Sequence, residues 1–372
     1  MKICYVINSL DGGGGALPVP NIVKVMRAAG HEVFVVALME RDGRARPALE
    51  AAATPYTVIG GARRAYVRTA VQLSGLVRGM APDIIWTSLS HATITGQLVG
   101  KLHGIPVISW LHNAWLKPAN TFIMRRTFEL TRHWVADSEA VALFGQKVLG
   151  IPAERISIWP IFQADPAQPV ARMAKPDCFR IGSLGRLHRN KGYDVLIEAL
   201  ALLRDRSPEI SRSVRVAIGG DGPARADLER RVADLHLANI EFPGFVDPAP
   251  FLAGLNCYVQ PSHHEGFCIA AHEAMCAGLP IVASPVGEMA HSVAKSQSGV
   301  LVDYGDIEGL SMALESLIRD PVEAARRGEI AREWAMKRYA PAAFMARGLN
   351  AISAAGLPVQ QDRPRPDVSR AS

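Results

Sequence analysis

Short runs of apolar residues alternate with amphipathic stretches through the first half of the chain. The apolar runs predict strands at Lys2–Asn8, Glu32–Leu38, Asp83–Thr87, Pro106–Trp110, Trp134–Asp137 and Arg155–Trp159. Between them, stretches such as Asn21–Ala29 and Tyr66–Met80 have the spacing of helices with one apolar face. This βαβ order predicts a parallel, doubly wound sheet.

The pattern then breaks and starts again. Phe162–Asp177 contains three prolines and no periodicity, so we predict a linker between domains. A second series of strands follows at Phe179–Leu184, Val214–Gly219, Ile240–Phe242, Asn256–Gln260, Pro280–Ala283 and Val300–Val302. Helical patterns separate them at Tyr193–Leu203, Ala224–Leu235 and Ile307–Ile318. The fold class expected is α/β, with two doubly wound Rossmann-like domains that face each other across a cleft.

These patterns set the expected domain boundaries. They are an N-terminal domain at 1–163, a linker at 164–177, a C-terminal domain at 178–337, and a helix at about 338–356 that packs back on the first domain. The polar, proline-bearing segment 358–372 is expected to be a disordered tail.

Composition excludes several classes of protein. The chain has 372 residues, 49% of them hydrophobic and 20% charged, which is enough apolar material for two cores. No apolar run approaches the length of a membrane span, and no secretory signal is expected. The cysteines Cys4, Cys178, Cys257, Cys268 and Cys276 are scattered without metal-ligand spacing. A reducing cytosol fits, whereas a disulfide framework or a zinc site does not.

Charge is placed unevenly. Residues 1–163 carry 17 Lys and Arg against 10 Asp and Glu, so the whole basic excess lies there. Such an excess serves solubility, or it faces an anionic partner such as lipid head groups or a diphosphate. No recognised nucleic-acid-binding motif is present, so no nucleic-acid partner is expected.

Ligands of doubly wound sheets bind beyond the carboxyl ends of the strands, so the loops there are the candidate sites. The loop Asp11–Gly15 contains four glycines, Gly14 among them, and would let the backbone approach an anion. The dinucleotide fingerprint fails because Leu17 stands where its third glycine would fall. A plain flexible turn is the alternative.

Two further loops carry charge. Arg186 and Lys191 lie in the segment Gly185–Gly192 before a helix, where they suit a phosphate, although a solvated basic loop is the alternative. Asp221, in Gly219–Pro223, either contacts a ligand or caps the helix that begins near Ala224.

Gln260–Met275 is the most informative segment. Glu265 lies in a polar loop after a strand, and Glu273 lies eight residues later in a helix expected to begin near Phe267. The neighbours of Glu273 at helical spacing are Ile269, Ala270, Cys276 and Ala277, and none can pair with a carboxylate. Sugar or ribose hydroxyls would satisfy it, while the amides of Gly266, Phe267 and Cys268 would bind an anion at the helix start. Together these features describe a nucleotide-sugar site.

At this segment the chain resembles the retaining glycosyltransferases of family 4, which have the GT-B fold. The resemblance rests on the Glu265-x7-Glu273 pair in its Pro-Ser-x-x-Glu-Gly-Phe context, and on Gly185-Arg186…Lys191-Gly192 and Gly220–Pro223. Phe242–Val246, Ala277–Ser284, Gly30–Val33 and Pro106–His112 also match.

The resemblance implies a role for each matching residue. Arg186 and Lys191 would clamp the donor diphosphate, and Glu273 would bind the ribose. Glu265, with the amides of Gly266, Phe267 and Cys268, would hold the donor sugar. His112 would lie near the reacting sugar, so the residues implied to be catalytic are Glu265, His112, Arg186 and Lys191. Gly14 and Asp221 complete the implied donor site.

It also implies the partners: a UDP- or GDP-sugar as donor, a glycan or lipid-linked acceptor, and no cofactor. Surface polysaccharide or glycolipid synthesis is the family's commonest setting. Cys268 departs from the glycine common in the family, and Pro18 and Pro20 move the helix start after the glycine loop to about Pro20.

Other readings remain open. His263 and His264 suggest a metal, but adjacent histidines on an extended loop are expected to point apart, and no zinc-binding helix motif occurs, so no metal site is expected. A second alternative, a nicotinamide-dependent oxidoreductase, would leave Glu265 and Glu273 unexplained. A sugar-nucleotide epimerase shares the fold without this carboxylate context. A non-catalytic sugar-nucleotide-binding protein of the same fold is the third alternative.

The basic N-terminal half also suggests a membrane surface. Arg63, Arg64, Arg68 and Arg78 flank an apolar stripe, and Arg125, Arg126 and Arg132 alternate with Phe122, Ile123 and Phe128. Ordinary solvated helix faces are the alternative. We expect a cytoplasmic enzyme that touches anionic lipid of the inner leaflet through Arg63, Arg64, Arg68, Arg125 and Arg126, or uses these residues toward the acceptor.

Overall fold

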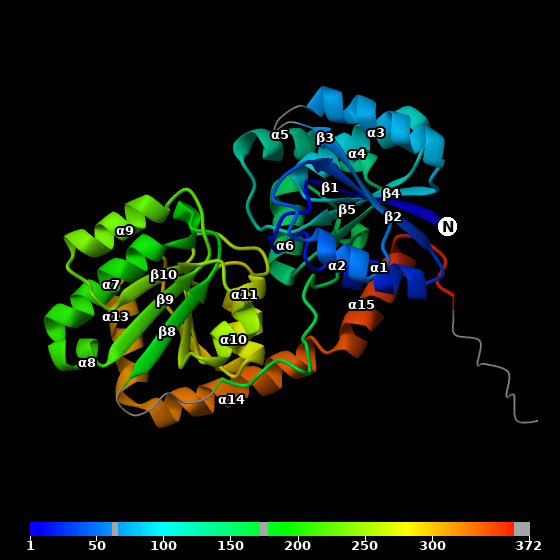
Figure 1. Ribbon diagram of the computed structural model, residues 1–372. Coiled ribbons are helices and arrows are strands. Elements are labelled where there is room, and N and C mark those ends of the chain that lie inside the picture. Colours follow the sequence, from blue (N-terminus) through cyan, green and yellow to red (C-terminus); the bar gives the residue numbers. More distant parts are fainter. Residues whose placement is uncertain (62–65, 172–177, 361–372) are drawn as a thin grey trace, which may run out of the picture.

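The computed structural model describes residues 1–61, 66–171 and 178–360. Two lobes lie side by side, each built on one sheet whose strands are all parallel (Figure 1). The predicted α/β fold of two Rossmann-like domains is therefore confirmed.

The N-terminal sheet has the strand order β3-β2-β1-β4-β5-β6-β7. Its strands are β1 (Lys2–Ile7), β2 (Glu32–Met39), β3 (Tyr56–Gly61), β4 (Ile84–Ser88), β5 (Val107–Leu111), β6 (His133–Ala136) and β7 (Ile156–Ile158). β3 was not predicted, although Tyr56–Ile59 are aromatic and β-branched residues that favour strands; the run is short, ends in two glycines and pairs with β2 in the structure. The predicted strand Arg155–Trp159 is shorter in the structure, where Trp159 is instead a buried residue of the core.

Helices of the N-terminal lobe connect these strands. They are α1 (Val19–Ala28), α2 (Arg46–Ala51), α3 (Tyr66–Met80), α4 (Ser90–His103), α5 (Pro118–Thr127) and α6 (Glu139–Phe144), which a π-helical turn (Gly145–Leu149) continues. Pro18 and Pro20 lie at the start of α1, where the fixed φ of proline favours a first helical turn.

The C-terminal sheet has the order β10-β9-β8-β11-β12-β13. Its strands are β8 (Phe179–Leu184), β9 (Val214–Gly219), β10 (Ile240–Gly244), β11 (Cys257–Gln260), β12 (Ile281–Ala283) and β13 (Gly299–Leu301). The helices are α7 (Tyr193–Arg206), α8 (Pro208–Arg212), α9 (Arg225–Asp234), α10 (Pro248–Ala253), α11 (Ile269–Cys276), α12 (Glu288–Ser296), α13 (Ile307–Arg319) and α14 (Pro321–Arg338).

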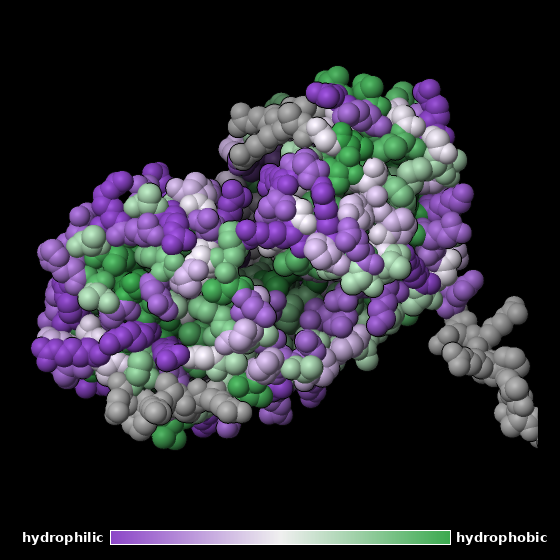
Figure 2. Space-filling model, in the orientation of Figure 1, coloured by the Kyte–Doolittle hydropathy of each residue, from purple (hydrophilic) through white to green (hydrophobic). Residues whose placement is uncertain are grey.

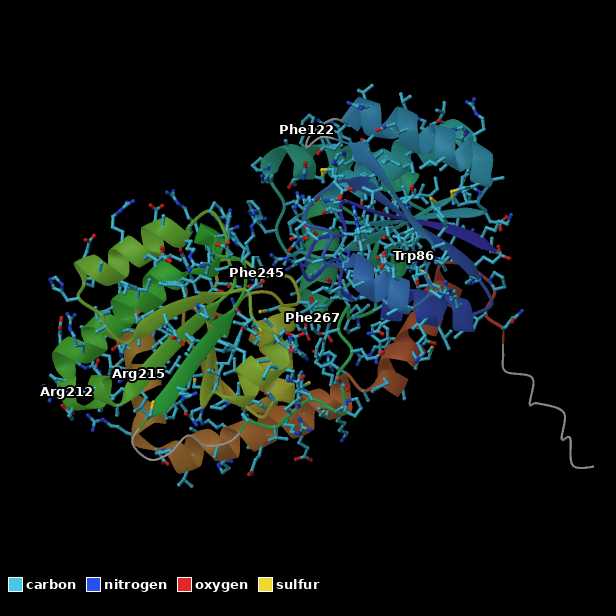
Figure 3. All side chains as sticks on the ribbon, in the orientation of Figure 1. Trp86, Phe122, Arg212, Arg215, Phe245 and Phe267 are labelled. Atoms are coloured by element: carbon cyan, nitrogen blue, oxygen red, sulfur yellow. The ribbon has the colours of Figure 1, made fainter. Side chains whose placement is uncertain are left out.

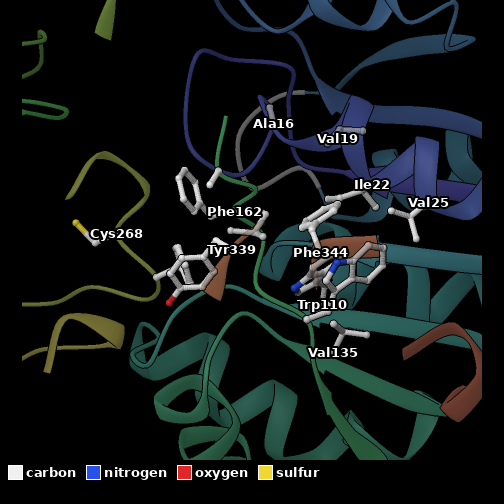
Figure 4. Close-up of a cluster of buried hydrophobic side chains, with 14 of the residues drawn as sticks. Ala16, Val19, Ile22, Val25, Trp110, Val135, Phe162, Cys268, Tyr339 and Phe344 are labelled. Carbon is white, nitrogen blue, oxygen red and sulfur yellow. The ribbon is translucent and has the colours of Figure 1, made fainter. Parts of the chain in front are cut away.

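The chain crosses between the lobes twice, and the two crossings touch. After α14 it returns to the N-terminal lobe, where α15 (Pro341–Ala354) packs against α1 and β7 (Figure 1). The amide of Ala164, on the first crossing, donates to the carbonyl of Tyr339, on the second, over 2.8 Å. Buried aromatic rings surround this point: Phe162 and Tyr339 lie 5.6 Å apart (Figure 4), and both contact the ring of Phe267. One hydrophobic core thus continues from lobe to lobe at the point where the two crossings touch.

Some predicted features fall outside the described residues, namely Arg63, Arg64, part of the predicted linker (172–177) and the tail from 361 on. At the start of that predicted tail, the Gln360 amide donates to the Ala29 carbonyl over 3.2 Å, so residues 358–360 lie on the N-terminal lobe. Among the described helices, none is both long and apolar enough to cross a membrane.

Candidate functional site

The carboxyl ends of the two sheets meet through their loops. An isolated antiparallel bridge pairs Asn113, after β5, with Gly266, after β11. The contact is so close that a Cβ on Gly266 would lie 1.7 Å from the carbonyl oxygen of His112. Nearby, a Cβ on Gly14 would meet the Ile269 side chain at 3.2 Å, which places the glycine loop against the start of α11. The predicted residues His112, Gly14 and Gly266 are therefore brought together between the lobes.

Glu265 and Lys191 form an ion pair within the C-terminal lobe. Lys191 ends a short 3-10 turn (Arg189–Lys191) after β8, and its Nζ lies 2.6 Å from Glu265 Oε1. Gly192 permits the approach, because it has a φ of +66° and a Cβ there would lie 1.9 Å from the Pro261 carbonyl oxygen. Burial disfavours the charged ammonium, but Glu265 outweighs it and the pKa of Lys191 is raised. Lys191 therefore stays cationic at the site.

A buried chain of hydrogen bonds holds the same carboxylate oxygen. Ser262 Oγ donates to Glu265 Oε1 over 2.8 Å, and Gln260 Nε2 donates to it over 3.3 Å. The Gln260 amide is held in turn, since the Tyr258 hydroxyl donates to its Oε1 over 2.8 Å. With Lys191, three donors converge on Oε1 and fix the orientation of Glu265. Sequence reasoning missed Tyr258 and Gln260, because their polar ends lie inside a strand that is apolar overall.

The second carboxylate, Glu273, lies about one turn into α11. Within the described part of the chain it has no hydrogen bond or ion pair, and burial raises its pKa to about 7. The helix begins at Ile269 and not near Phe267 as predicted, because Cys268 takes the left-handed conformation with a φ of +64°. The thiol of Cys268 is buried beside Glu265 and Lys191, and its pKa is raised mainly by burial.

Two predicted phosphate or ligand contacts lie on the surface. Arg186 is exposed, and among the described residues it has no ion pair or side-chain hydrogen bond. Asp221 is also exposed, and its Oδ1 accepts from the Gly222 amide over 2.7 Å. It does not cap α9, whose N-cap is Ala224 without a side-chain hydrogen bond, so that alternative for Asp221 is wrong.

Phe267 is part of the hydrophobic core. Its buried ring stacks on His272 at 4.2 Å and on Phe162 at 5.9 Å, in the core that the two lobes share. Phe245 follows β10 and lies on the side of the C-terminal lobe that faces the N-terminal lobe (Figure 3). Its ring is covered by the guanidinium of Arg44 at 3.3 Å, which is a further contact between the lobes.

His112 follows β5 and is held at both ring nitrogens. Nε2 lies 2.7 Å from Ser88 Oγ, and Nδ1 lies 3.0 Å from Asp137 Oδ2. Sequence reasoning missed Ser88 and Asp137. Both lie at the carboxyl ends of strands, which is the same position that pointed to the other loops, but neither belongs to a motif that singles it out.

The adjacent histidines do not point apart as expected. The rings of His263 and His264 stack at 3.8 Å, His264 stacks on Trp115 of the other lobe at 5.1 Å, and His263 stacks on Tyr304 at 4.4 Å. Stacking buries ring faces that an extended loop would otherwise expose, and this outweighs the local tendency of neighbouring side chains to diverge. Across the described residues, no cluster of three or more His, Cys, Asp or Glu side chains is arranged to hold a metal ion.

The described arginines that were expected to face lipid or acceptor lie in two helices of the N-terminal lobe. Arg68 lies in α3, and Arg125 and Arg126 lie in α5, all exposed. The guanidinium of Arg126 lies 3.7 Å from the centre of the Phe122 ring. Arg63 and Arg64 are outside the described residues.

Known proteins resemble this chain over both lobes. Residues 171–334 match the family described as glycosyl transferases group 1, and residues 12–162 match glycosyltransferase family 4. A D-inositol 3-phosphate glycosyltransferase of Pseudarthrobacter chlorophenolicus is 26% identical over 86% of both chains. A glycogen synthase of Mycobacterium tuberculosis is also 26% identical, over 86% of both chains. HepE from Anabaena, solved in complex with UDP-glucose, has the same fold, with a TM-score of 0.81 at 22% identity over 95% of this chain and 100% of HepE.

Proposed function

The chain belongs to the family 4 glycosyltransferases of GT-B fold, and from this premise we propose that it transfers a hexose, with retention of configuration, from a nucleoside diphosphate sugar to a glycan or glycolipid. The observation that carries the proposal is the ion pair of Lys191 and Glu265, which lies where the loops of the two lobes meet near His112. A cation beside a fixed carboxylate suits a substrate that joins a phosphate to a sugar.

Each group has a part in the proposed reaction. The C1–O bond to the diphosphate breaks, and its electron pair stays on the departing phosphate oxygen, where Lys191 and Arg186 stabilise the growing charge. The acceptor oxygen bonds to C1 on the same face, and its proton passes to the departing phosphate. Glu265 holds the sugar, and Glu273 accepts hydrogen bonds from the ribose hydroxyls.

The solved HepE complex with UDP-glucose supports a UDP-sugar as donor, and a GDP-sugar is the other candidate. Melting temperatures measured with UDP-, GDP- and ADP-sugars test this choice, because a ligand that binds only the native state stabilises it. At 100 times its Kd, the donor adds about 2.7 kcal/mol to the free energy of unfolding. Donor-dependent release of the nucleoside diphosphate then separates a transferase from a non-catalytic sugar-nucleotide-binding protein. If no nucleotide sugar raises the melting temperature, the proposal is wrong.

We also propose that the N-terminal lobe rests on anionic lipid at the cytoplasmic face of a membrane, during surface polysaccharide or glycolipid synthesis. Val67 and Val71 in α3 are 79% and 67% exposed, and Phe122 in α5 is 59% exposed. Exposed arginines lie beside them, and apolar residues over α3 are visible at the end of the lobe (Figure 2). Apolar side chains among cations are the composition expected of an interfacial surface.

A further inference from the structure

Three polar side chains from neighbouring strands meet at the carboxyl end of the N-terminal sheet. Ser88 ends β4, His112 follows β5 and Asp137 follows β6, and these strands are adjacent in the sheet. Ser88 Oγ lies 2.7 Å from His112 Nε2, while Asp137 Oδ2 and Oδ1 lie 3.0 and 3.2 Å from His112 Nδ1. The arrangement is linear, with the imidazole between a hydroxyl and a carboxylate.

Asp137 is placed to define which ring nitrogen carries hydrogen. Its side chain is 2% exposed, and burial raises its pKa while His112 and Trp110 oppose that shift. The indole N–H of Trp110 donates to Oδ1 over 2.6 Å, and an indole nitrogen can only donate. When Asp137 is ionised it can only accept, so its second hydrogen bond also requires a donor, and this geometry assigns a hydrogen of His112 to Nδ1.

The other ring nitrogen is then an acceptor. In the neutral ring with hydrogen on Nδ1, Nε2 has a lone pair, and the Ser88 hydroxyl donates to it. Stacking on the Trp110 ring at 5.6 Å and 18° restricts rotation of the imidazole. Ser88 is followed by Leu89, which has a φ of +76°, a rare conformation for leucine that the strand-to-helix turn maintains beside the cleft.

We infer that Asp137 and Ser88 are positioning residues for His112. Asp137 keeps the ring in the form that presents Nε2 as a hydrogen-bond acceptor, and Ser88 occupies Nε2 until a hydroxyl of the donor sugar replaces it. This inference rests on the proposed function, in which His112 lies beside the reacting sugar. It adds that a hydroxyl of the donor sugar donates a hydrogen bond to Nε2 of His112.

Asp137→Asn is the discriminating substitution. The amide oxygen of the new residue would still accept the hydrogen bond from Trp110. Its NH2 group would face Nδ1 of His112, so Nδ1 would have to accept a hydrogen bond. The hydrogen of His112 would move to Nε2, and the acceptor would be lost. Ser88→Ala removes the neighbour of Nε2 without this effect, so it should leave the hydrogen on Nδ1.

Nitrogen-15 NMR of histidine side chains shows directly which ring nitrogen of His112 carries hydrogen. The His112 signals are identified by their loss in His112→Ala. We expect an Nδ1–H ring in the wild-type protein and in Ser88→Ala, and an Nε2–H ring in Asp137→Asn. An Nε2–H ring in the wild-type protein overturns the inference. This readout does not depend on turnover, so it decides the tautomer even if the proposed function fails.

Kinetics test the consequence for catalysis. Asp137→Asn should lower kcat about 10-fold, the scale for loss of one hydrogen bond, with donor KM changed less than threefold. In a His112→Ala background the same substitution should change kcat less than twofold. Ser157→Ala is the matched control, because Ser157 Oγ lies 2.8 Å from Nε2 of His133, a histidine held by serine at the other end of the sheet. It should leave kcat unchanged. An equal loss from Asp137→Asn with and without His112 would show that Asp137 acts on the fold alone and would overturn the inference.

Discussion

The Nζ atom of Lys191 lies 2.6 Å from Oε1 of Glu265, although the two residues are 74 positions apart in the chain. Lys191 follows β8 and Glu265 follows β11, and these two strands are neighbours in the sheet. The strand order therefore creates the pair, and the backbone contact of Gly192 with Pro261 keeps the two loops together.

Lys191→Ala and Arg186→Ala should both cripple transfer, with different effects on stability. Loss of one group that stabilises the leaving diphosphate should cost on the order of 3 kcal/mol in the transition state, a fall of about 100-fold in kcat. Arg186 is exposed, so its loss should leave the melting temperature unchanged, whereas loss of Lys191 leaves Glu265 without its cation and should lower it. Arg189→Ala, in the same loop, is the control for both assays. Turnover near the wild-type rate in both variants would show that Lys191 and Arg186 do not stabilise the departing diphosphate.

Glu265→Gln and Glu273→Gln should differ in kinetics. Gln at 265 removes the charge that we propose to face the reacting sugar, so kcat should fall at least tenfold with a smaller change in donor KM. Gln at 273 should weaken the hydrogen bonds that we propose Glu273 accepts from the ribose, so donor KM should rise about tenfold, equivalent to about 1.4 kcal/mol, with kcat nearly retained. Steady-state kinetics with the identified donor measure both effects. The reverse pattern would mean that the two roles are exchanged.

The stability of the protein should depend on the ionisation of Glu273. Burial raises its pKa from 4.5 to about 7, so the folded state keeps a proton that the unfolded chain loses between these values. The stability that neutral Glu273 contributes is therefore present at low pH and is lost as the pH rises to 7. Glu273→Gln stays neutral, and its stability relative to the wild-type protein should increase by up to roughly 3 kcal/mol between pH 5 and pH 8. Urea unfolding at the two pH values measures this difference, and an unchanged difference would contradict the assignment.

Gly266→Ala should prevent closure of the cleft. A Cβ at this position would lie 1.7 Å from the backbone oxygen of His112, and backbone on both sides cannot give way. We expect kcat to fall at least 100-fold and small-angle scattering to show a larger radius of gyration. Gly13→Ala is the matched control in the glycine loop, since a Cβ there meets nothing within 4 Å. Activity retained by Gly266→Ala would show that the contact of Gly266 with His112 is dispensable.

Membrane binding should require the basic surface of the N-terminal lobe. Each basic residue near an anionic surface contributes about 1 kcal/mol, so Arg125→Gln with Arg126→Gln should weaken binding to anionic vesicles by roughly tenfold or more. Arg212→Gln with Arg215→Gln is the matched control, because these exposed arginines lie at the far end of the other lobe (Figure 3). Sedimentation with anionic and neutral liposomes at low and high salt measures the effect. Protein that stays in the supernatant with both liposomes at low salt would exclude the membrane role and favour a soluble acceptor.

The sequence by itself determined the fold class, the family and the loops in which the chemistry should lie. Apolar runs that alternate with helical periods indicate parallel strands, and parallel strands place all their following loops at one edge of the sheet. Both lobes have this organisation, and Glu265 and Lys191 follow neighbouring strands of the second sheet.

Only the tertiary structure decided what each loop contacts. The sequence marks Glu265, and Tyr258, Gln260 and Ser262 precede it at alternate positions of the same segment. Lys191, however, reaches the same carboxylate oxygen from a loop 74 positions away. His112 is similar, since Ser88 and Asp137 reach it from separate strands. Stacking across the cleft turned His263 and His264 toward each other, and the turn before α11 placed Cys268 in a left-handed conformation. Periodicity reports burial along one element, whereas these contacts depend on the register and closure of different elements, for which a single sequence has no local signal.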